Sequence, residues 1–546
     1  EPNRSSEGIF IYNKISIVSD TTNTELEETK SKLKKCEAGF HDASQNDDKD
    51  TDNDAYNYND NDTDNDIEAD SCYLQTEIYT ELWENGRKLD VRVNLLRYAI
   101  KSLENNNPDK KSNEKSNEES NKKSNEEIKA NLRRYEIQKG VKRELKRQLY
   151  KVLSNFTGKN MPWGMLTGIR PAKIVHEMIG KSLPKTAIID RLNNYYMVND
   201  KKAEILYNVS EKEGRILSKT RENMVSVYIG IPFCISKCSY CSFTSNPIDN
   251  SSGIVTKYTD ALIDELVKTS QLIADKGWAV QSVYIGGGTP TSIDEQNLKR
   301  VLDAVESYIN MDSIEEYTLE AGRPDSINDE KLSVIKNSRV TRISINPQSM
   351  NDDVLNNIGR KHTSQDIVRA FRRARELGFT NINMDIIAGL PGETPEMFED
   401  SLKRIIELAP ESLTVHTLSV KRGSKLIEQA KDNDYAKARQ IEHMVEAAQE
   451  YAASIGMKPY YLYRQKNILG NLENVGYCMD GFESVYNIQI MEEKQSIIAL
   501  GAGAITKIVY PVENRIERAF NVKNVDEYIK RVDEMVQRKE LLIIEQ

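Results

Sequence analysis

One stretch decides the fold of this chain: Val225-Ser-Val-Tyr-Ile-Gly-Ile-Pro-Phe-Cys234-Ile-Ser-Lys-Cys238-Ser-Tyr-Cys241. Its first seven residues are mostly β-branched or aromatic, which is typical of a buried strand. Three cysteines then follow within eight residues, whereas the whole chain of 546 residues has six. So few cysteines do not make a disulfide framework. A strand that runs into three closely spaced thiols predicts a metal-binding loop.

From about residue 224 onward, short β-rich runs alternate with amphipathic helical stretches. The expected strands are Val225–Ile231, Val280–Ile285, Tyr317–Ala321, Thr341–Asn346, Asn381–Ala388 and Ser412–Thr417. Helices fit between them, for example Tyr258–Lys276, Asp294–Ile309 and Ser364–Leu377. Such repeated units build a parallel sheet with right-handed crossovers. Because six units are too few for a closed eight-stranded barrel, we predict an α/β fold with an open, partial (β/α)6 barrel. Its chemistry should lie on the loops at the C-terminal strand ends.

The regions outside the barrel predict a domain order. We expect an N-terminal α/β region at 1–130, a helical connecting region at 131–220, the barrel at 221–440, and a C-terminal α-rich extension at 441–546 that closes the active site. Strands beginning at Tyr73 and Leu89 should form a hairpin around Asn85-Gly86. Insertions at about 42–70 and 105–127 are too poor in apolar residues to order, so we expect disordered loops. The Asp-rich tract lacks the Gly and terminal Glu of a calcium loop.

The charge and hydrophobicity of the chain argue against a nucleic-acid-binding or membrane-spanning protein. The formal net charge of −10 arises from residues 42–70, which hold twelve acidic residues and one Lys. The remainder is close to neutral and has no basic stripe, so no nucleic-acid partner is expected. No apolar run reaches the length of a membrane span. The start, Glu1-Pro2-Asn3-Arg4, has neither Met nor an apolar signal core. We expect a cytoplasmic protein that lacks its short true N-terminus.

The cysteine spacing favours a [4Fe–4S] cluster. The Cys-x3-Cys-x2-Cys loop lets Cys234, Cys238 and Cys241 hold three corners of a cubane and leaves the fourth iron without a protein ligand. A zinc site is the alternative, but zinc normally takes four ligands, usually in separated pairs. Chance clustering of buried thiols is a second alternative.

Further candidates stand at the ends of later strands. Gly286-Gly-Gly-Thr289-Pro290 follows the second strand, and its glycines permit close backbone approach to a small polar ligand. An Asp inside an apolar parallel strand, as at Asp385, is costly unless it has partners. Taken alone, the Gly-rich stretch is better explained as an ordinary tight turn between strand and helix, and Asp385 could equally be a cap or an ion-pair partner. The same holds for three other polar residues near strand ends: Glu320, Gln348 and Arg360.

The Cys-x3-Cys-x-aromatic-Cys loop after a first strand resembles the radical S-adenosylmethionine (SAM) superfamily. In that superfamily the iron without a protein ligand binds SAM, and an aromatic residue of the loop lies beside the adenine. Tyr240 occupies this aromatic position here. Reduction of the cluster cleaves SAM to methionine and a 5′-deoxyadenosyl radical. The resemblance therefore implies one [4Fe–4S] cluster, one or two SAM molecules, and an electron donor such as flavodoxin or ferredoxin.

Over roughly 222–510 the motifs resemble the oxygen-independent coproporphyrinogen III oxidases. That likeness implies that Tyr228, a catalytic residue with the three cysteines, contacts the cluster-bound SAM together with Gly287, Glu320 and Ile505. It also implies a second SAM held by Gly288, Thr289, Gln348, Arg360 and Asp385. The implied reaction converts coproporphyrinogen III propionates to vinyl groups by loss of CO2, giving protoporphyrinogen IX. A monomer with a tetrapyrrole substrate is expected.

Two further stretches resemble the HemZ-type branch of that family. They are Pro162-Trp-Gly-Met-Leu-Thr-Gly-Ile-Arg-Pro-Ala-Lys and Tyr463-Arg-Gln-Lys-Asn-Ile-Leu-Gly-Asn-Leu-Glu-Asn-Val-Gly-Tyr. Two positions depart from the characterised oxidases: Gly230 stands where they commonly carry His, and Phe243 where they carry a fourth Cys. These departures leave the substrate and the second-SAM chemistry open. Candidate cations for the substrate carboxylates are Lys421, Arg422, Lys425 and Arg464.

Two other functions remain open. A haem carrier of the same superfamily keeps the cluster and delivers haem, but it bears a His-Asn-x-x-Tyr-Trp segment that is absent near 463–477. Of the five histidines here, His416 at the end of the sixth strand is the candidate haem ligand. An anaerobic haem-degrading radical SAM methyltransferase is the second alternative. The other cysteines, Cys36, Cys72 and Cys478, are not expected to act.

Overall fold

The computed structural model describes residues 10–18, 73–84, 87–99, 140, 143–243, 245–248, 253–421, 424, 426, 435–465, 468–511, 513 and 515–544. The chain divides into two compact units, Glu1–Met165 with Asn194–Val198, and Leu166–Asn193 with Asn199–Gln546. Several sequence predictions lie outside the described residues: both low-complexity insertions, Cys36, Cys72, Arg422 and Lys425.

The first unit contains an antiparallel sheet in the order β1–β2–β3. Its strands are β1 (Phe10–Val18), β2 (Tyr73–Glu84) and β3 (Arg87–Ala99). The β2–β3 register pairs Glu84 with Arg87, so a two-residue connection joins them. The predicted hairpin around residues 85–86 is thus confirmed, and residues 143–157 add a helix.

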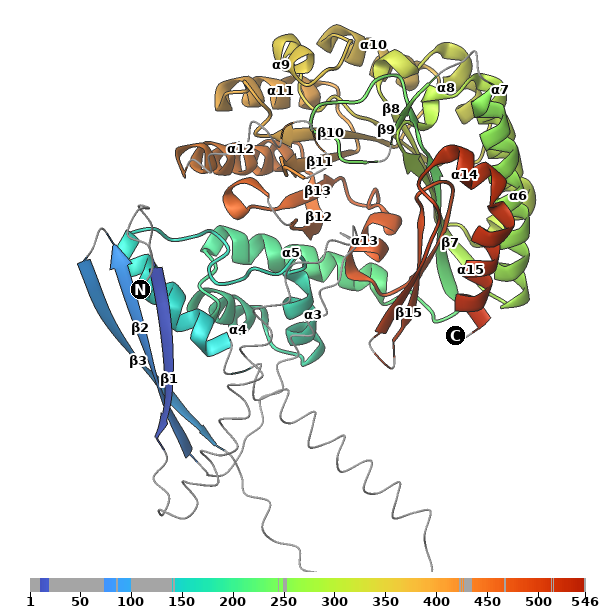
Figure 1. Cartoon of the computed structure of the whole chain (residues 1–546). Coiled ribbons are helices and arrows are strands. Elements are labelled where there is room, and N and C mark those ends of the chain that lie inside the picture. The colour runs from blue at the N-terminus through green and yellow to red at the C-terminus, as the bar shows by residue number, and fades with distance from the viewer. Residues whose placement is uncertain are drawn as a thin grey trace, which may run out of the picture. The chain divides into compact units, whose positions relative to one another are not determined.

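The second unit is built on strand-then-helix repeats (Figure 1). In chain order they are β4 (Met224–Ile231), α6 (Ile254–Asp275), β7 (Ala279–Gly287), α7 (Glu295–Tyr308), β8 (Glu316–Gly322), α8 (Asp329–Lys336), β9 (Arg342–Ile345), α9 (Asp352–Asn357), α10 (Ser364–Glu376), β10 (Ile382–Ala388), α11 (Pro395–Glu407), β11 (Ser412–Thr417) and α12 (Tyr435–Ser454). Every predicted strand of the barrel is present. The predicted helices are also present, with ends within a few residues of those expected.

These strands lie side by side in chain order and parallel, from β4 through β7, β8, β9 and β10 to β11. The sheet has two ends and does not close on itself within the described part of the chain. It is therefore an open, partial (β/α)6 barrel. Parallel strands bury both faces, and most residues of β4, β8 and β9 are buried as this requires.

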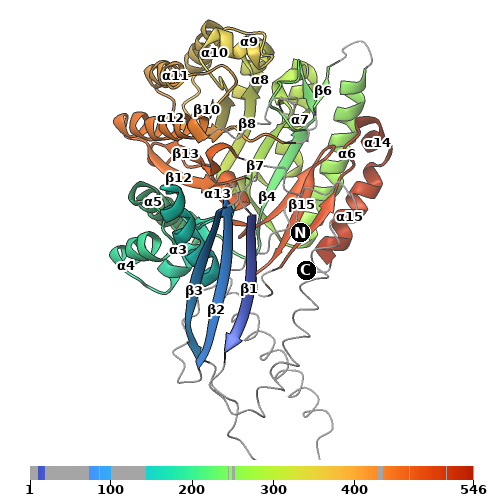
Figure 2. The ribbon, with the colours of Figure 1, turned by 60° about the vertical axis from the view of Figure 1, so that its left-hand side comes forward.

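The C-terminal residues extend this sheet at both ends. Next to β11 lie β13 (Asn474–Cys478) and then β12 (Lys458–Tyr463), and next to β4 lie β14 (Ser496–Leu500), β15 (Ile505–Tyr510) and β16 (Arg515–Phe520). The C-terminal helices are α13 (Val485–Glu492), α14 (Val525–Lys530) and α15 (Val532–Ile544). In Figure 2 the last two lie beside α6.

The residues before the barrel contribute helices to the same unit. These are α3 (Ala172–Gly180), α4 (Lys185–Asp190) and α5 (Asp200–Leu217). Helix α5 begins at the Asn199 cap, whose side chain accepts a hydrogen bond from the Lys202 N–H, as N-cap residues do. It packs against α3 and β12. None of the helices in the described ranges has the length and apolarity needed to traverse a bilayer.

Candidate active site

The three-cysteine loop follows directly from β4. A two-stranded pairing of β5 (Phe233–Cys234) with β6 (Asn246–Pro247) closes the loop at its base. The Ser239 N–H donates to the Ile358 carbonyl at 3.0 Å, and the Cys241 N–H donates to the Cys238 carbonyl at 3.2 Å. Cys238 is buried, Cys234 and Cys241 are partly exposed, and none is in a disulfide. Backbone bonds thus hold the three thiols on one short loop at the C-terminal end of the first parallel strand.

The spacing of these thiols fits a cluster better than a single ion. Among the described residues, the three sulfur atoms do not form a group within 4.8 Å of one another. Around one zinc ion, bonds of about 2.3 Å would bring the sulfurs within roughly 3.8 Å of each other. A cubane spans a larger volume and accepts three thiolates from one loop. Three thiols on one short loop therefore fit a [4Fe–4S] cluster.

Two buried guanidinium groups approach the cysteine loop. Arg323 Nη1 lies 3.8 Å from Cys238 Sγ, and it also donates to the Ser236 carbonyl at 2.9 Å. Arg360 Nη2 donates to the Tyr240 hydroxyl at 3.2 Å. Burial raises the pKa of both the Cys234 and the Cys241 thiol, because a thiolate loses its solvation there. Thiols lose their protons when they bind a metal. The two guanidinium groups beside the loop would stabilise the negatively charged thiolates of the metal-bound form.

The glycine-rich loop packs onto the cysteine loop. The Gly288 N–H donates to the Ile231 carbonyl and the Thr289 N–H to the Phe233 carbonyl, both at 2.8 Å. A Cβ on Gly288 would lie 2.4 Å from the Phe233 carbonyl oxygen and 3.0 Å from Cys234 Sγ. Gly287 has φ +113°, a conformation that L side chains rarely adopt. Glycine is therefore required here by the approach of two backbones next to the Cys234 thiol.

Glu320 and Asp385, the carboxylates predicted on the third and fifth strands, have the same charged neighbours, His416 and Arg342. Glu320 on β8 accepts a hydrogen bond from the Tyr284 hydroxyl at 2.5 Å. Burial raises the pKa of Glu320 to about 7, the nearby Asp385 carboxylate adds to this shift, and the Tyr284 hydrogen bond offsets part of it. Asp385 on β10 is equally desolvated, but His416 and the Asn383 amide, which donates to it at 2.7 Å, hold its pKa below the usual range. The two carboxyl groups therefore differ in protonation near neutral pH.

Gln348 sits where β9 and β10 end. Its N–H donates to the Asp385 carbonyl at 2.9 Å, and its carbonyl accepts from the Ile387 N–H at 3.0 Å. It has φ +66°, a left-handed conformation that costs a non-glycine residue about 1–2 kcal/mol. The Oε1 atom is buried without a hydrogen-bond partner within the described ranges. A strained residue that presents an unpaired acceptor is a ligand-binding candidate.

Tyr228 faces other aromatic side chains. Its ring stacks on Tyr284 and on Tyr486, each at 6.3 Å between centroids, and those two rings stack on each other at 4.5 Å. Burial raises the pKa of Tyr228, so its hydroxyl stays protonated. Ile505 opens β15, next to the strand that pairs with β4. A Cβ on Gly501 would lie 2.4 Å from the Gly230 carbonyl, so the loop before Ile505 packs on the end of β4.

Some residues near the site escaped the sequence prediction. Tyr486 comes from α13, and no sequence pattern ties that helix to β4. Arg323 directly follows the strand that carries Glu320, so its place after a strand end could have indicated it. Among the predicted cations, Arg464 donates to the Leu166 carbonyl at 2.6 Å and the Asn471 carbonyl at 2.8 Å, which gives it a structural role. Cys478 is buried in an apolar cluster with Tyr460, Tyr461 and Ile488.

Comparison with known proteins places this geometry in context. Residues 228–405 match the model of the Radical SAM superfamily. The oxygen-independent coproporphyrinogen-III oxidase-like protein HemZ of Bacillus subtilis is 40% identical over 391 residues, which span 71% of this chain and 78% of HemZ. The heme chaperone HemW of the same organism is 39% identical over 199 residues, 36% of this chain and 51% of HemW.

A solved structure, the coproporphyrinogen III oxidase HemN of Escherichia coli, superposes with a TM-score of 0.47 at 24% identity. The match covers 59% of this chain and 72% of that chain.

Proposed function

Because this chain belongs to the radical SAM superfamily, in the family of the HemZ relative, we propose that it is an enzyme that oxidatively decarboxylates propionate side chains of coproporphyrinogen III. Radical SAM proteins bind a [4Fe–4S] cluster and SAM, and this chain is one of them. The observation that carries the proposal is the joining of the cysteine loop to the glycine loop at one edge of the open barrel. A substrate on this edge would meet Tyr228, Glu320 and Asp385.

Each residue has a proposed role. Cys234, Cys238 and Cys241 hold the cluster, and Arg323 and Arg360 offset its negative charge. Tyr240, Gly287, Glu320 and Ile505, with Tyr228, bind the SAM on the cluster. When bound, the cluster and SAM supply the 5′-deoxyadenosyl radical that removes a hydrogen atom from the substrate. Gly288, Thr289, Gln348, Arg360 and Asp385 bind a second SAM, for which the unpaired Gln348 Oε1 offers an acceptor. A flavodoxin or ferredoxin supplies electrons.

The test is anaerobic reconstitution of the cluster, followed by SAM, a reductant and coproporphyrinogen III. We expect 5′-deoxyadenosine, CO2 and a vinyl-bearing product, and none of these from the Cys238→Ala variant. If 5′-deoxyadenosine forms without a decarboxylated product, the oxidase proposal is wrong and the radical SAM assignment stands. Lys421 is a candidate partner of the substrate carboxylates, and Lys421→Gln should then raise KM more than it lowers kcat.

The likeness to the heme chaperone HemW favours a second candidate, a haem carrier. His416 would be its axial ligand. The His416 imidazole is already placed by other groups, since Nε2 lies 3.8 Å from Asp385 and Nδ1 lies 3.5 Å from the Tyr463 hydroxyl. A carrier would bind unmodified haem, and His416→Ala would abolish the Soret shift on titration. Haem binding without consumption of coproporphyrinogen would favour the carrier.

A further inference from the structure

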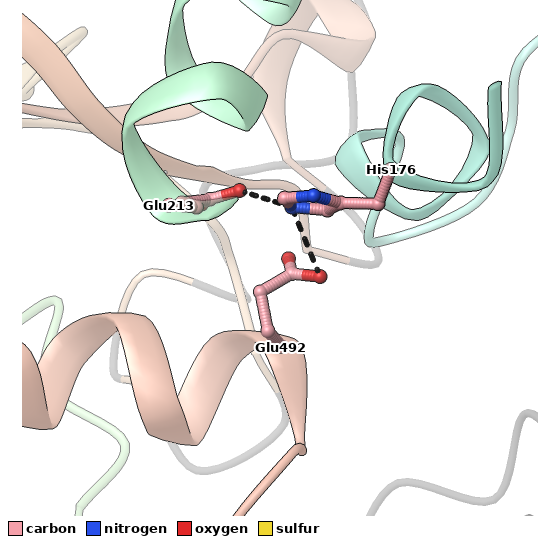
Figure 3. Close-up of side chains that lie close together, drawn as sticks. All are labelled: His176, Glu213 and Glu492. Carbon is pink, nitrogen blue, oxygen red and sulfur yellow. Dashed lines mark hydrogen bonds and ion pairs between the residues drawn. The ribbon is translucent and has the colours of Figure 1, made fainter. Parts of the chain in front are cut away.

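A second cluster of metal-ligating side chains lies in the second unit, on elements far apart in the sequence. His176 comes from α3, Glu213 from α5 and Glu492 from the last residue of α13 (Figure 3). His176 Nε2 lies 2.9 Å from Glu213 Oε2 and 3.7 Å from Glu492 Oε2. Each residue offers one ligand atom, and these three atoms all lie within 4.8 Å of one another. Figure 3 shows both carboxylates directed at the imidazole.

The site carries charge that its own residues do not neutralise. The Glu213 side chain is fully buried, and that of Glu492 is 2% exposed. Within the described part of the chain, the Oε1 atoms of both glutamates are buried without a hydrogen-bond partner. The Oε2 atoms face His176, and a hydrogen bond from the Leu462 N–H also stabilises the Glu213 carboxylate. A buried carboxylate oxygen without a partner is costly. Burial, with the neighbouring Glu492, accordingly raises the pKa of Glu213.

The cations around the site offset part of this cost, and the pKa of Glu213 is still raised. Burial lowers the pKa of His176 despite the nearby Glu492, and the Lys494 ammonium also disfavours its positive form. Lys173 on α3 faces Glu492 and Glu177, but burial and the neighbouring Lys494 and Arg170 lower its pKa as well. Two carboxylates therefore meet one imidazole that favours its neutral form, and a neutral imidazole is a metal ligand rather than a counter-ion.

We propose that His176, Glu213 and Glu492 bind one divalent transition-metal ion of the zinc or manganese class. Bonds of about 2.1 Å to nitrogen and oxygen place neighbouring ligand atoms roughly 3.0–3.4 Å apart, and the observed 2.9 and 3.7 Å bracket that spacing. A charge of +2 cancels the two carboxylates. One imidazole and two carboxylates are ligands that zinc and manganese both accept.

The ion would join the helices before the barrel to α13. That helix also carries Tyr486, which stacks on Tyr228 and Tyr284. Metal binding would thereby fix the helix that positions the tyrosine stack. This inference does not depend on the proposed decarboxylation.

The experiment uses the full chain with its cluster loaded, so that the cysteines are occupied. Zn2+ and Mn2+ are titrated separately by calorimetry under anaerobic conditions, and bound metal is counted after gel filtration beside iron and sulfide. We expect one saturable equivalent, and at least tenfold weaker binding in Glu492→Gln and His176→Gln. Glu211→Gln is the matched control, because Glu211 is exposed on the same helix as Glu213. Binding in Glu492→Gln equal to that of the wild type would overturn the proposal, as would the lack of a saturable equivalent.

Thermal unfolding supplies the second readout. Zn2+ or Mn2+ should raise the Tm of the wild type and leave the Tm of His176→Gln unchanged. Without metal, Glu492→Gln should be at least as stable as the wild type, because it removes a buried charge whose Oε1 atom has no hydrogen-bond partner among the described residues. A structural ion pair with a charged His176 would give the opposite sign, with loss of stability in Glu492→Gln and no response of the wild-type Tm to metal. That combination would refute the metal site.

Discussion

Substitution of Gly288 by Ala should release the cluster from a chain that still folds. The added Cβ would lie 2.4 Å from the Phe233 carbonyl oxygen, a backbone atom that cannot rotate away. Ordinary contact needs about 3.4 Å, so one backbone must move by roughly 1 Å. That movement strains the two 2.8 Å hydrogen bonds between the loops, each contributing about 1 kcal/mol. With overpacking of about 1–3 kcal/mol, the local cost is roughly 2–4 kcal/mol.

This cost falls on the loop that holds Cys234, so cluster affinity should drop by at least tenfold while far-ultraviolet circular dichroism is retained. Iron and sulfide are counted after anaerobic reconstitution, together with the Tm. Gly180→Ala is the control, because a Cβ there meets nothing within 4 Å. Gly288 is outside the left-handed region, so backbone strain does not confuse the result. If Gly288→Ala retains full iron and sulfide with unchanged Tm, the packing argument for the glycine loop is wrong.

Two other substitutions test the electrostatics. The pKa of Glu320 is about 7 in the folded chain and near 4.5 in the unfolded chain. The protonated form therefore contributes its full stability below pH 4.5, and this contribution is lost as the pH rises through 7. Glu320→Gln should therefore gain about 2–3 kcal/mol relative to the wild type between pH 4.5 and 8, measured by urea unfolding, and an unchanged difference would contradict the raised pKa. Lys539→Met leaves the Glu265 carboxylate buried without its ammonium partner and should cost about 3–5 kcal/mol. Adding Glu265→Gln should restore most of that loss. If the double variant shows no recovery, the loss does not come from the unpaired Glu265 charge.

The barrel could be predicted because its signal is local. Each strand is a short, largely apolar run, and the parallel order follows from the helices between strands. The cysteine loop could be identified in the same way, because its three cysteines lie within eight residues. Contacts between distant stretches could not be predicted. The stack of Tyr486 on Tyr228 depends on how α13 packs, and the meeting of His176, Glu213 and Glu492 depends on three helices at once.

The two stretches outside the barrel that resemble the HemZ-type branch contact each other in the structure. The Arg464 N–H donates to the Ile169 carbonyl at 2.8 Å, and its guanidinium donates to the Leu166 carbonyl. Arg464 thus belongs to the second stretch and binds the backbone of the first. Arg170, also in the first stretch, pairs with Glu493 at 2.6 Å, immediately after the proposed metal ligand Glu492. Because a guanidinium can bind several carbonyls at once, these arginines fix the residues before the barrel to those after it. Arg464 therefore holds the two stretches together, and the Arg170–Glu493 pair joins the residues before α3 to the end of α13.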